Sequence, residues 1–365
     1  MQRLGLNCLR PEMVAAMDIM DSGGRLLIRC GQALQESHIE AMRRFGFESA
    51  YVALPGFLEH NPVDDFISPE LRAEAIGLIS QLYENFYSKS DIDGAPLRDL
   101  ASRLVNEIIL NRRCLFQFVD LRTPEQYLPA HVVNVTILSV LIGLKMDYTA
   151  VRLQELAIGT LLMDIGEMLI PAAILRKSAC LTPEEMEQIK QHPENGLDGL
   201  RKKLGALPAT SRQVAYQHHE SFDGKGYPRG CSGAAIHEYA RIASVADMFD
   251  ALVSDRPFRH YYLPHEALAI LNALSGHLLD PEIIRLLLPR VAPYPVGSLV
   301  AVDSGEIGEV EALNPEHPAR PIIRLLMDPW GNRTKEKDSM DLGRTQSRRI
   351  VKVFKDQEIM DWVLS

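Results

Sequence analysis

The sequence predicts a mainly α-helical protein, with a helical middle flanked by a small α/β segment and a small β-rich segment. Apolar residues recur at spacings of three and four between residues 97 and 290, which is typical of helices with one buried face. After Pro293, short β-prone runs alternate with turn sequences. The 365 residues are 46% hydrophobic and 24% charged, which is ordinary for a globular chain with a large core.

The N-terminal part divides into two predicted segments. Residues 1–60 are expected to form the small α/β domain, because a β-prone run at 25–28 follows a Ser-Gly-Gly turn and a helical stretch at 36–45 stops at a glycine. Residues 61–96 are expected to be a helical linker, since a helical pattern at 70–87 lies between two polar breaks.

Residues 97–290 are expected to form one helical domain. Helical spacing recurs within it at 100–110, 132–144, 153–162 and 283–288. Thr182 and Glu185 have the spacing of a capping box, and Pro183 between them is typical of a first helical turn. These signals predict several helices that pack as a bundle.

Residues 291–365 are expected to form the β-rich C-terminal domain. The β-prone runs in this segment are 298–302, 307–313 and 322–327. Asp-Ser-Gly and Asn-Pro turn sequences separate them, so the pattern predicts short strands joined by tight loops.

Charge, cysteines and hydropathy exclude several classes of protein. The net charge is −9, from 39 Lys and Arg against 48 Asp and Glu, whereas a chain that coats duplex nucleic acid has the opposite balance. The five cysteines form no CxxC pair, which argues against a thiolate zinc site or a disulfide framework and favours the cytoplasm. The most apolar run, 132–144, has 13 residues with polar interruptions, so we expect no membrane span. Any anionic ligand must be met by local cations or bound metal.

Six histidine and aspartate residues form a candidate metal-binding set. They are His131, Asp164 in MDIGE, His192 in KQHPENG, His218 and His219 in HHESFDGKGYP, and Asp247 in SVADMFDAL. Imidazole and carboxylate donors suit Fe, Mn or Zn, and helices can direct them into one bundle interior. Since a single helical histidine is more often a core or surface residue, the order of the whole set decides its interpretation.

The order of these motifs resembles that of the HD-GYP family, a branch of the HD superfamily of metal-dependent phosphohydrolases. The similarity covers roughly residues 125–270 and includes IPAAILRKSACLTPEEMEQIKQHPENG, HHESFDGKGYPRG and ARIASVADMFDALVSDRPFR. It implies an HD-type helical bundle with two or three divalent metals. In such a centre a metal-bridging hydroxide, formed because the metals lower the pKa of water toward ~7, would hydrolyse the phosphodiester of cyclic di-GMP.

The resemblance also assigns roles to residues. Metal ligands would be His131, Asp164, His192, His218, His219 and Asp247, with Asp164 bridging. Catalytic roles would fall to Asp164 and Glu167. Two divalent metal sites are expected, with Fe or Mn favoured over Zn, Ni or Mg. The nucleotide would contact Gly226, Tyr227, Pro228, Asp250, Arg256 and Arg259, where glycine permits close approach and the arginines pair with phosphate oxygens.

Three positions depart from the family pattern. Met163 replaces the histidine of the His-Asp pair, and its soft thioether matches Fe or Mn poorly, so one metal site is expected to be weak or lost. Glu167 replaces a lysine taken to stabilise the phosphate, and an ionised carboxylate ~4 Å from a phosphate would repel it by about 4 kcal/mol. Tyr127 replaces a glutamate that holds a third metal in some members, which makes a trinuclear centre unexpected.

Glu167 offers a hypothesis for the missing ligand. Met163, Asp164 and Glu167 are separated by three and four positions, so on a helix they would share a face. Glu167 could then supply the donor that Met163 lacks.

These departures leave three functions open. One is a cyclic di-GMP phosphodiesterase impaired by Met163 and Glu167, and the alternative is a catalytically inactive cyclic di-GMP receptor or protein-interaction module. The third and weakest is hydrolysis of another phosphate ester. The expected partner is cyclic di-GMP or a related small nucleotide, with diguanylate cyclase-type proteins and a second copy of the chain as further candidates.

Overall fold

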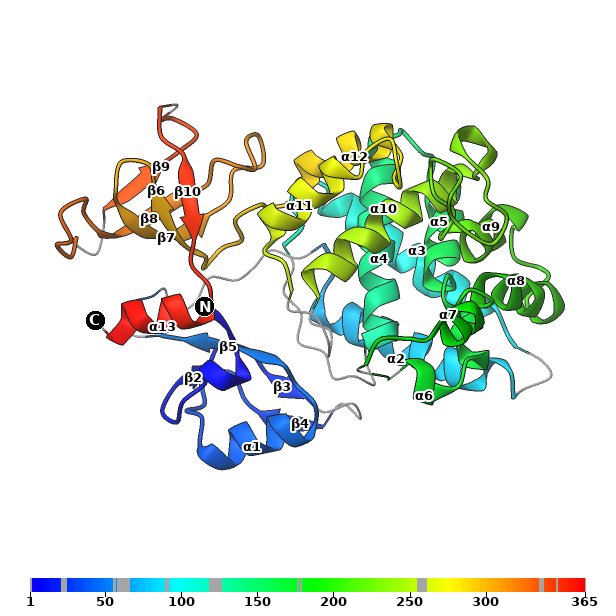
Figure 1. The fold of residues 1–365 in the computed structure, drawn as a ribbon, viewed down its shortest axis with the longest axis horizontal. Helices are drawn as coiled ribbons and strands as arrows, with labels where there is room; N and C mark the ends of the chain where they lie inside the picture. Colours follow the sequence, from blue (N-terminus) through cyan, green and yellow to red (C-terminus); the bar gives the residue numbers. More distant parts are fainter. Residues whose placement is uncertain are drawn as a thin grey trace. The chain divides into compact units, whose positions relative to one another are not determined.

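Two units make up the chain in the computed structural model (Figure 1). Unit 1 contains Met1–Asp64, Leu115–Glu125 and Val291–Ser365, and unit 2 contains Asp65–Cys114 and Gln126–Arg290. The structure describes residues 2–20, 25–54, 57, 66–88, 92–117, 127–175, 177, 179–254, 261–334, 338–345 and 347–364.

The N-terminal part of unit 1 is a small α/β fold, as the sequence predicts. Its elements are β1 (Gln2–Gly5), the 3-10 helix η1 (Leu6–Cys8), β2 (Val14–Ala15), β3 (Ile19–Met20), β4 (Leu26–Ile28), α1 (Glu36–Arg44) and β5 (Ser49–Ala53). β5 is the central strand of an antiparallel sheet in the order β1-β5-β2, and β3 pairs with β4. The helix α1 buries Ile39 and Met42.

The C-terminal part of unit 1 is β-rich, which confirms the second flanking segment. Its elements are β6 (Leu299–Val302), β7 (Ile307–Ala312), β8 (Ile322–Met327), β9 (Ser339–Asp341), β10 (Ile350–Val353) and α13 (Asp356–Leu364). The strands form one antiparallel sheet in the order β10-β6-β7-β8-β9. Across β7 and β8, the buried carboxylate of Glu309 pairs with Arg324 at 2.8 Å.

The two ends of the chain share a hydrophobic core. Leu4 and Val52 of the N-terminal sheet belong to one buried cluster with Leu299 of β6 and with Ile359 and Met360 of α13. Because these segments are far apart in the sequence, no local sequence pattern predicts that they pack together. The boundaries 1–60, 61–96, 97–290 and 291–365 remain a prediction, and in the structure the first and last of these segments belong to one unit.

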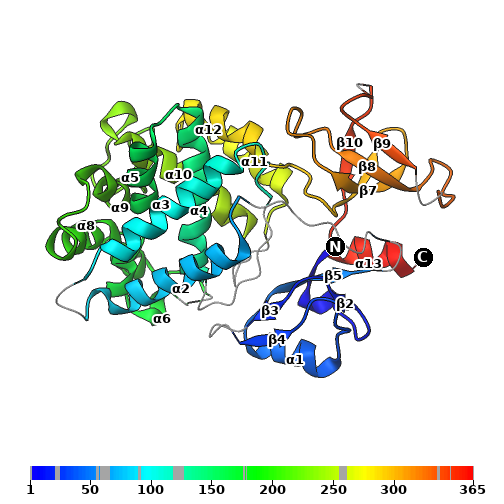
Figure 2. The ribbon, with the colours of Figure 1, turned by 180° about the vertical axis from the view of Figure 1, so that it is seen from behind.

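Unit 2 is a bundle of helices around α4 (Figure 2). Its elements are α2 (Pro69–Phe86), α3 (Ala95–Leu110), α4 (Tyr127–Lys145), α5 (Ala150–Leu161), the 3-10 helix η2 (Ile165–Leu169), α6 (Ala172–Leu175), α7 (Pro183–Ile189), α8 (His192–Lys203), α9 (Ala209–Gln217), the 3-10 helix η3 (Gly233–Ala235), α10 (Glu238–Val253), α11 (Pro264–Ala273), α12 (Pro281–Leu287) and the 3-10 helix η4 (Leu288–Arg290). α4 contacts α2, α3, α5, α10 and α12. The capping box of Thr182 and Glu185 at the start of α7 is confirmed.

α4 is the one helix among the described residues that is long and apolar enough to cross a membrane. It has 19 residues, so the expectation that this apolar segment is too short is wrong. The helix is longer than the apolar run 132–144 because it begins earlier, with a first turn formed by Tyr127–Ala130. The core of unit 2 accounts for its composition, since 83% of its most apolar window is buried.

Replacing Ile359 by alanine should destabilise unit 1. The side chain is 4% exposed within the shared core, and such truncations cost about 2 to 5 kcal/mol. Both tryptophans of the chain, Trp330 and Trp362, lie in unit 1, so their fluorescence in a urea titration reports the unfolding of this unit. Val351→Ala, at a side chain that is 56% exposed, is the matched control and should cost about 1 kcal/mol or less. Equal midpoints for the two variants would contradict the shared core.

Candidate metal centre

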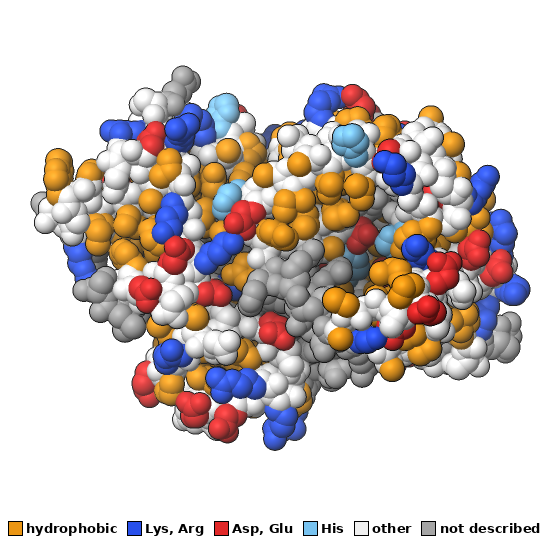
Figure 3. Space-filling view, viewed as in Figure 1, with side chains coloured by type: hydrophobic (Ala, Val, Ile, Leu, Met, Phe, Trp, Pro, Cys, Tyr) orange, Lys and Arg blue, Asp and Glu red, His pale blue; other side chains and the backbone are white. Residues whose placement is uncertain are grey.

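Five segments of unit 2 bring the predicted ligands together. α4 supplies His131, Asp164 directly precedes η2, and His192 is the first residue of α8. His218 and His219 follow the end of α9, and α10 supplies Asp247. In the space-filling view, histidine and acidic side chains lie at the floor of a recess in the helical unit, with apolar side chains around it (Figure 3).

One group of donors gathers on the first oxygen of Asp164. Asp164 Oδ1 lies 3.2 Å from His218 Nε2 and 3.7 Å from His192 Nε2, and these two nitrogens are 3.3 Å apart. His219 completes the group, in which each of the four residues offers a ligand atom within 4.8 Å of the others. Two imidazole nitrogens that face one carboxylate oxygen at these distances suit a shared cation.

A second group gathers on the other oxygen of the same carboxylate. His131 Nε2 lies 3.9 Å from Asp164 Oδ2 and 3.1 Å from Asp247 Oδ1. Each oxygen of the Asp164 carboxylate therefore has a different group of candidate metal ligands beside it. A carboxylate in this position can be shared by two divalent cations.

The imidazoles have their outer nitrogens occupied, which turns the inner ones toward the site. The Nδ1 atoms of His192 and His218 donate to the carbonyls of Ile189 and Val214, at 2.8 and 2.9 Å. A carbonyl only accepts, so each Nδ1 carries a proton, and in the neutral form of each ring Nε2 presents a lone pair toward Asp164. Ligating histidines are typically oriented in this way by an outer hydrogen bond.

Asp250 orients the third imidazole, that of His131. Its Oδ2 atom lies 2.7 Å from His131 Nδ1 and 3.3 Å from Ser254 Oγ, while Asn134 Nδ2 donates to Oδ1 at 2.9 Å. The Asp250 side chain is fully buried. These contacts show that Asp250 supports His131, and its predicted contact with the nucleotide stays a prediction.

The neighbouring histidines keep the carboxyl of Asp164 ionised. Burial alone would raise the pKa of Asp164, but the hydrogen bond and charge of His218, with His192 and His131 nearby, lower it to about 2. Burial, and then His218, lowers the pKa of His192 to about 4 and that of His219 well below its usual range. At neutral pH Asp164, His192 and His219 thus present one anion and two neutral imidazoles. Burial alone would lower the pKa of His218 and of His131, but hydrogen bonds to Asp164 and to Asp247 and Asp250 raise both, so a divalent metal that bound here would displace protons from these two rings.

Comparison with known proteins agrees with this geometry. An HD domain family model matches residues 103–283, and a model of the KOW domain associated with the HD domain matches residues 299–361. The cyclic di-GMP phosphodiesterase PA4108 of Pseudomonas aeruginosa is 32% identical over 71% of this chain and 63% of its own length. The HDG"Y"P protein Bd1817 of Bdellovibrio bacteriovorus has a similar fold, with a TM-score of 0.50 over 78% of this chain and 97% of that chain, at 19% identity. The chain belongs to the HD-GYP family.

A further relative of this HD-GYP protein is a cyclic di-GMP phosphodiesterase of Thermotoga maritima, which is 31% identical over 62% of this chain and 64% of its own length. The chain spans less than two thirds of the length of either phosphodiesterase. These matches establish the family and the fold of the chain, but they do not establish its activity or its substrate.

The degenerate His-Asp segment of this HD-GYP protein is not one helical face. α5 ends at Leu161, and Asp164 has φ −101° and ψ 13° before the 3-10 helix η2, so the expectation of a shared α-helical face is wrong. Met163 is 1% exposed. Glu167 donates its backbone N–H to the Asp164 carbonyl at 2.9 Å, and burial, followed by the charge of Asp164, raises the pKa of its carboxyl to about 8. The repulsion expected between Glu167 and a phosphate applies only to the ionised form.

The GYP loop packs against the histidines of the candidate metal centre. The Tyr227 ring stacks on His219 with centroids 4.8 Å apart, and Pro228 follows across a cis peptide bond. A Cβ on Gly226 would clash with the backbone nitrogen of Ser221 and with the His219 carbonyl oxygen. The loop's own backbone thus requires this glycine, whereas the sequence interpretation attributes it to a bound nucleotide.

Arg256 and Arg259 lie outside the described residues, so their contact with phosphate remains a prediction.

Tyr127 stacks on His131 with ring centroids 5.8 Å apart and 9° between the planes. A stacked aromatic ring occupies the place where a third metal ligand was considered.

Sequence reasoning missed two residues that support this site. Asn134 lies one turn after His131 and interrupts the apolar run 132–144. The sequence analysis uses this interruption only as evidence against a membrane span. A buried polar residue in such a run is a signal for a buried partner, here Asp250. Glu220 is also buried and accepts the backbone N–H groups of Arg229 and Cys231 at 2.8 and 2.9 Å, which closes the GYP loop.

The stabilisation that Asp223 gives the GYP loop should depend on pH. Hydrogen bonds from Ser221 Oγ and Lys225, together with the Lys225 charge, lower its pKa from 3.8 to about 2. A folded-state pKa below the unfolded value stabilises the fold above about pH 4 and loses that effect as the pH falls toward 2. The Asp223→Asn variant should be less stable than wild type at pH 7, with a gap that narrows from about pH 5 to pH 3.

Urea midpoints measured across this range check the prediction. Glu187→Gln, at an exposed position on α7, is the control and should follow wild type at every pH. A difference in urea midpoint between Asp223→Asn and wild type that stays constant down to pH 3 would contradict the predicted pH dependence.

Proposed function

We propose that this HD-GYP protein binds divalent cations around Asp164 and slowly hydrolyses cyclic di-GMP there. The observation that supports this most is the orientation of His131, His192 and His218. Their Nδ1 atoms are occupied by outer partners, and their Nε2 atoms face the two oxygens of one buried carboxylate. This is a suitable set of donors for two cations that share a carboxylate.

The proposed centre has two unequal subsites. The first has four protein donors, which are Asp164, His192, His218 and His219. The second has Asp164, His131 and Asp247. Met163 occupies the family's histidine position and offers a soft thioether, so we expect the three-donor subsite to bind its cation more weakly.

The chain's own residues set up the chemistry around these cations. When bound, divalent cations polarise a phosphoryl group and lower the pKa of water. Asp164, Asp247 and the four imidazoles of the two subsites would hold these cations inside the bundle. Tyr227 borders the site through its stacking on His219, and we assign Arg256 and Arg259 to phosphate. Cyclic di-GMP is the proposed substrate because two relatives are named for its hydrolysis.

A receptor function is the second candidate, and Met163 and Glu167 favour it. Met163 is buried, so no other side chain can take the position of its thioether without repacking. Glu167 places a carboxyl where the family pattern has a cation. Binding of the dinucleotide could survive these changes while its hydrolysis is lost.

Restoring the family residues should raise the hydrolysis rate. Met163→His supplies an imidazole, and Glu167→Lys replaces a carboxyl by a cation. The double variant, loaded with Mn²⁺ or Fe²⁺, should hydrolyse cyclic di-GMP at least about tenfold faster than wild type. Chromatography gives the rate, and mass spectrometry gives the metal content per chain. The matched control makes the same two substitutions on α7, at the exposed residues Met186 and Glu187.

The outcomes separate the two functions. A wild type that binds cyclic di-GMP without cleaving it, beside a double variant that cleaves it, identifies a receptor. Equal rates for wild type and the double variant would show that Met163 and Glu167 do not impair the site. A wild type that neither binds nor cleaves the dinucleotide rejects both candidates.

Glu167 itself can be tested as the replacement ligand. If its carboxyl supplies the donor that Met163 lacks, Glu167→Ala should bind the weaker cation at least about tenfold less tightly. Metal content per chain after dialysis against limiting Mn²⁺ measures this, with Glu187→Ala as the exposed control. Equal metal content in Glu167→Ala and wild type would remove Glu167 from the site.

A further inference from the structure

α2 lies outside the segment that matches the HD domain model, yet it reaches the candidate metal centre. The match covers residues 103–283, and α2 is Pro69–Phe86. α2 contacts both α4, which contains His131, and η2, which follows Asp164. Two polar side chains of α2, Arg72 and Tyr83, make hydrogen bonds toward these two sides of the site.

Arg72 is linked to His131 by a chain of hydrogen bonds. Arg72 Nη1 donates to Asn134 Oδ1 at 2.7 Å, and Asn134 Nδ2 donates to Asp250 Oδ1 at 2.9 Å. Asp250 Oδ2 in turn lies 2.7 Å from His131 Nδ1. The Asn134 amide can have only this orientation, because Arg72 needs an acceptor and the Asp250 carboxylate needs a donor.

Charge explains why the chain ends on an arginine. Asp250 is fully buried, and a buried carboxylate is costly unless hydrogen bonds and an opposite charge compensate it. Arg72 brings a permanent positive charge to the Asn134 amide that contacts Asp250, and it polarises that amide in the favourable direction. Loss of Arg72 would weaken the support on which the orientation of His131 depends.

Tyr83 supports the segment that leads to Asp164. Its hydroxyl donates to the Leu161 carbonyl at 3.0 Å, and its side chain is 3% exposed. Leu161 is the last residue of α5, where carbonyls have no partner within the helix. The bond therefore satisfies a buried carbonyl three residues before Asp164.

The two side chains belong to one face of α2. Arg72 and Tyr83 are eleven residues apart, which is close to three helical turns. A single rigid helix can thus support His131 and Asp164 at the same time.

We propose that Arg72 and Tyr83 are positioning residues which set the cation affinity of this site by orienting His131 and the Asp164 segment. The proposal rests on the metal centre put forward as the function. It makes α2 part of the centre even though its sequence lies outside the HD domain match.

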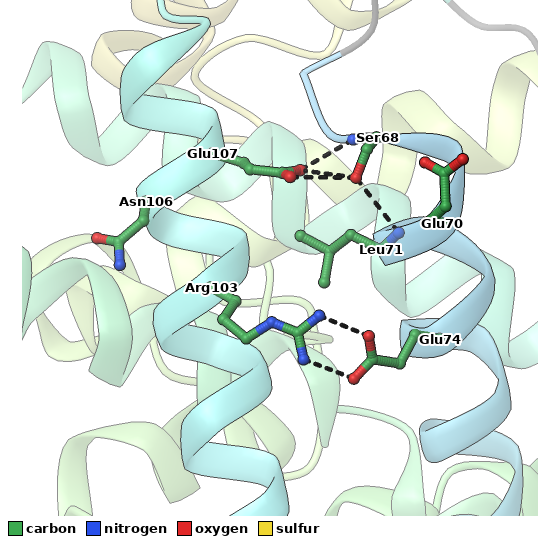
Figure 4. A pocket seen from close by; sticks show the side chains of 7 residues that line it. All are labelled: Ser68, Glu70, Leu71, Glu74, Arg103, Asn106 and Glu107. Atoms are coloured by element: carbon green, nitrogen blue, oxygen red, sulfur yellow. Dashed lines mark hydrogen bonds and ion pairs between the residues drawn. The ribbon is translucent and has the colours of Figure 1, made fainter.

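The test measures Mn²⁺ affinity of the full chain by competition with a fluorescent chelator. Arg72→Ala should bind Mn²⁺ about tenfold more weakly than wild type, and Tyr83→Phe a few-fold more weakly. Arg72→Lys keeps the charge and a donor, so it should recover most of the affinity. The control is Arg103→Ala, which removes an exposed arginine of α3 that pairs with Glu74 of α2 (Figure 4). It should stay within about twofold of wild type.

Thermal denaturation with and without Mn²⁺ separates positioning from folding. A positioning role reduces the rise in Tm that Mn²⁺ produces. A merely structural role lowers Tm equally in both conditions and leaves the affinity unchanged, which would overturn the proposal. Arg72→Ala binding Mn²⁺ as tightly as Arg103→Ala would also overturn it, with the metal centre intact. A wild type that binds no Mn²⁺ rejects the metal centre itself, so the two failures are distinguishable.

Discussion

The buried carboxylate of Asp164 is the group on which the arrangement of the helical unit depends. An isolated charge inside a bundle costs several kcal/mol, so Asp164 requires compensating partners. His218, His192 and His131 provide them and keep the carboxyl ionised, with a pKa of about 2. α4, α8 and the end of α9 therefore each present an imidazole to this carboxylate, which directly precedes η2.

The polar interior is stable because its members satisfy one another. Each imidazole that faces Asp164 uses its second nitrogen on a helix carbonyl or on Asp250. Asp250 in turn is supported by Asn134 and Ser254. These outer hydrogen bonds hold each imidazole in one orientation, since rotation of a ring would leave a buried donor or acceptor unpaired. This fixed orientation would suit the cations that we propose, and it is the reason for proposing that residues outside the ligand set influence their binding.

Sequence and structure agree best where chemistry depends on residue type and local spacing. The predicted ligand set converges, and the helical middle and β-rich end are confirmed. They differ most at residues 163–167, where the hypothesis of a shared helical face requires an α-helix, whereas α5 ends at Leu161, close to the end of its apolar pattern, and a 3-10 helix follows Asp164. At Asp250 and Gly226 the structure adds what the motif does not show, because side chains of other helices surround Asp250 and the loop's own backbone crowds Gly226.

The sequence by itself determined the class of fold, the order of the ligand motifs and the two departures at Met163 and Glu167, because periodicity and donor chemistry are properties of local sequence. Only the tertiary structure decided which residues support those ligands. Asp250 meets His131 across 119 residues, and Arg72 reaches Asn134 across 62. Such pairings depend on how helices pack, and no spacing within one helix specifies its partner on another.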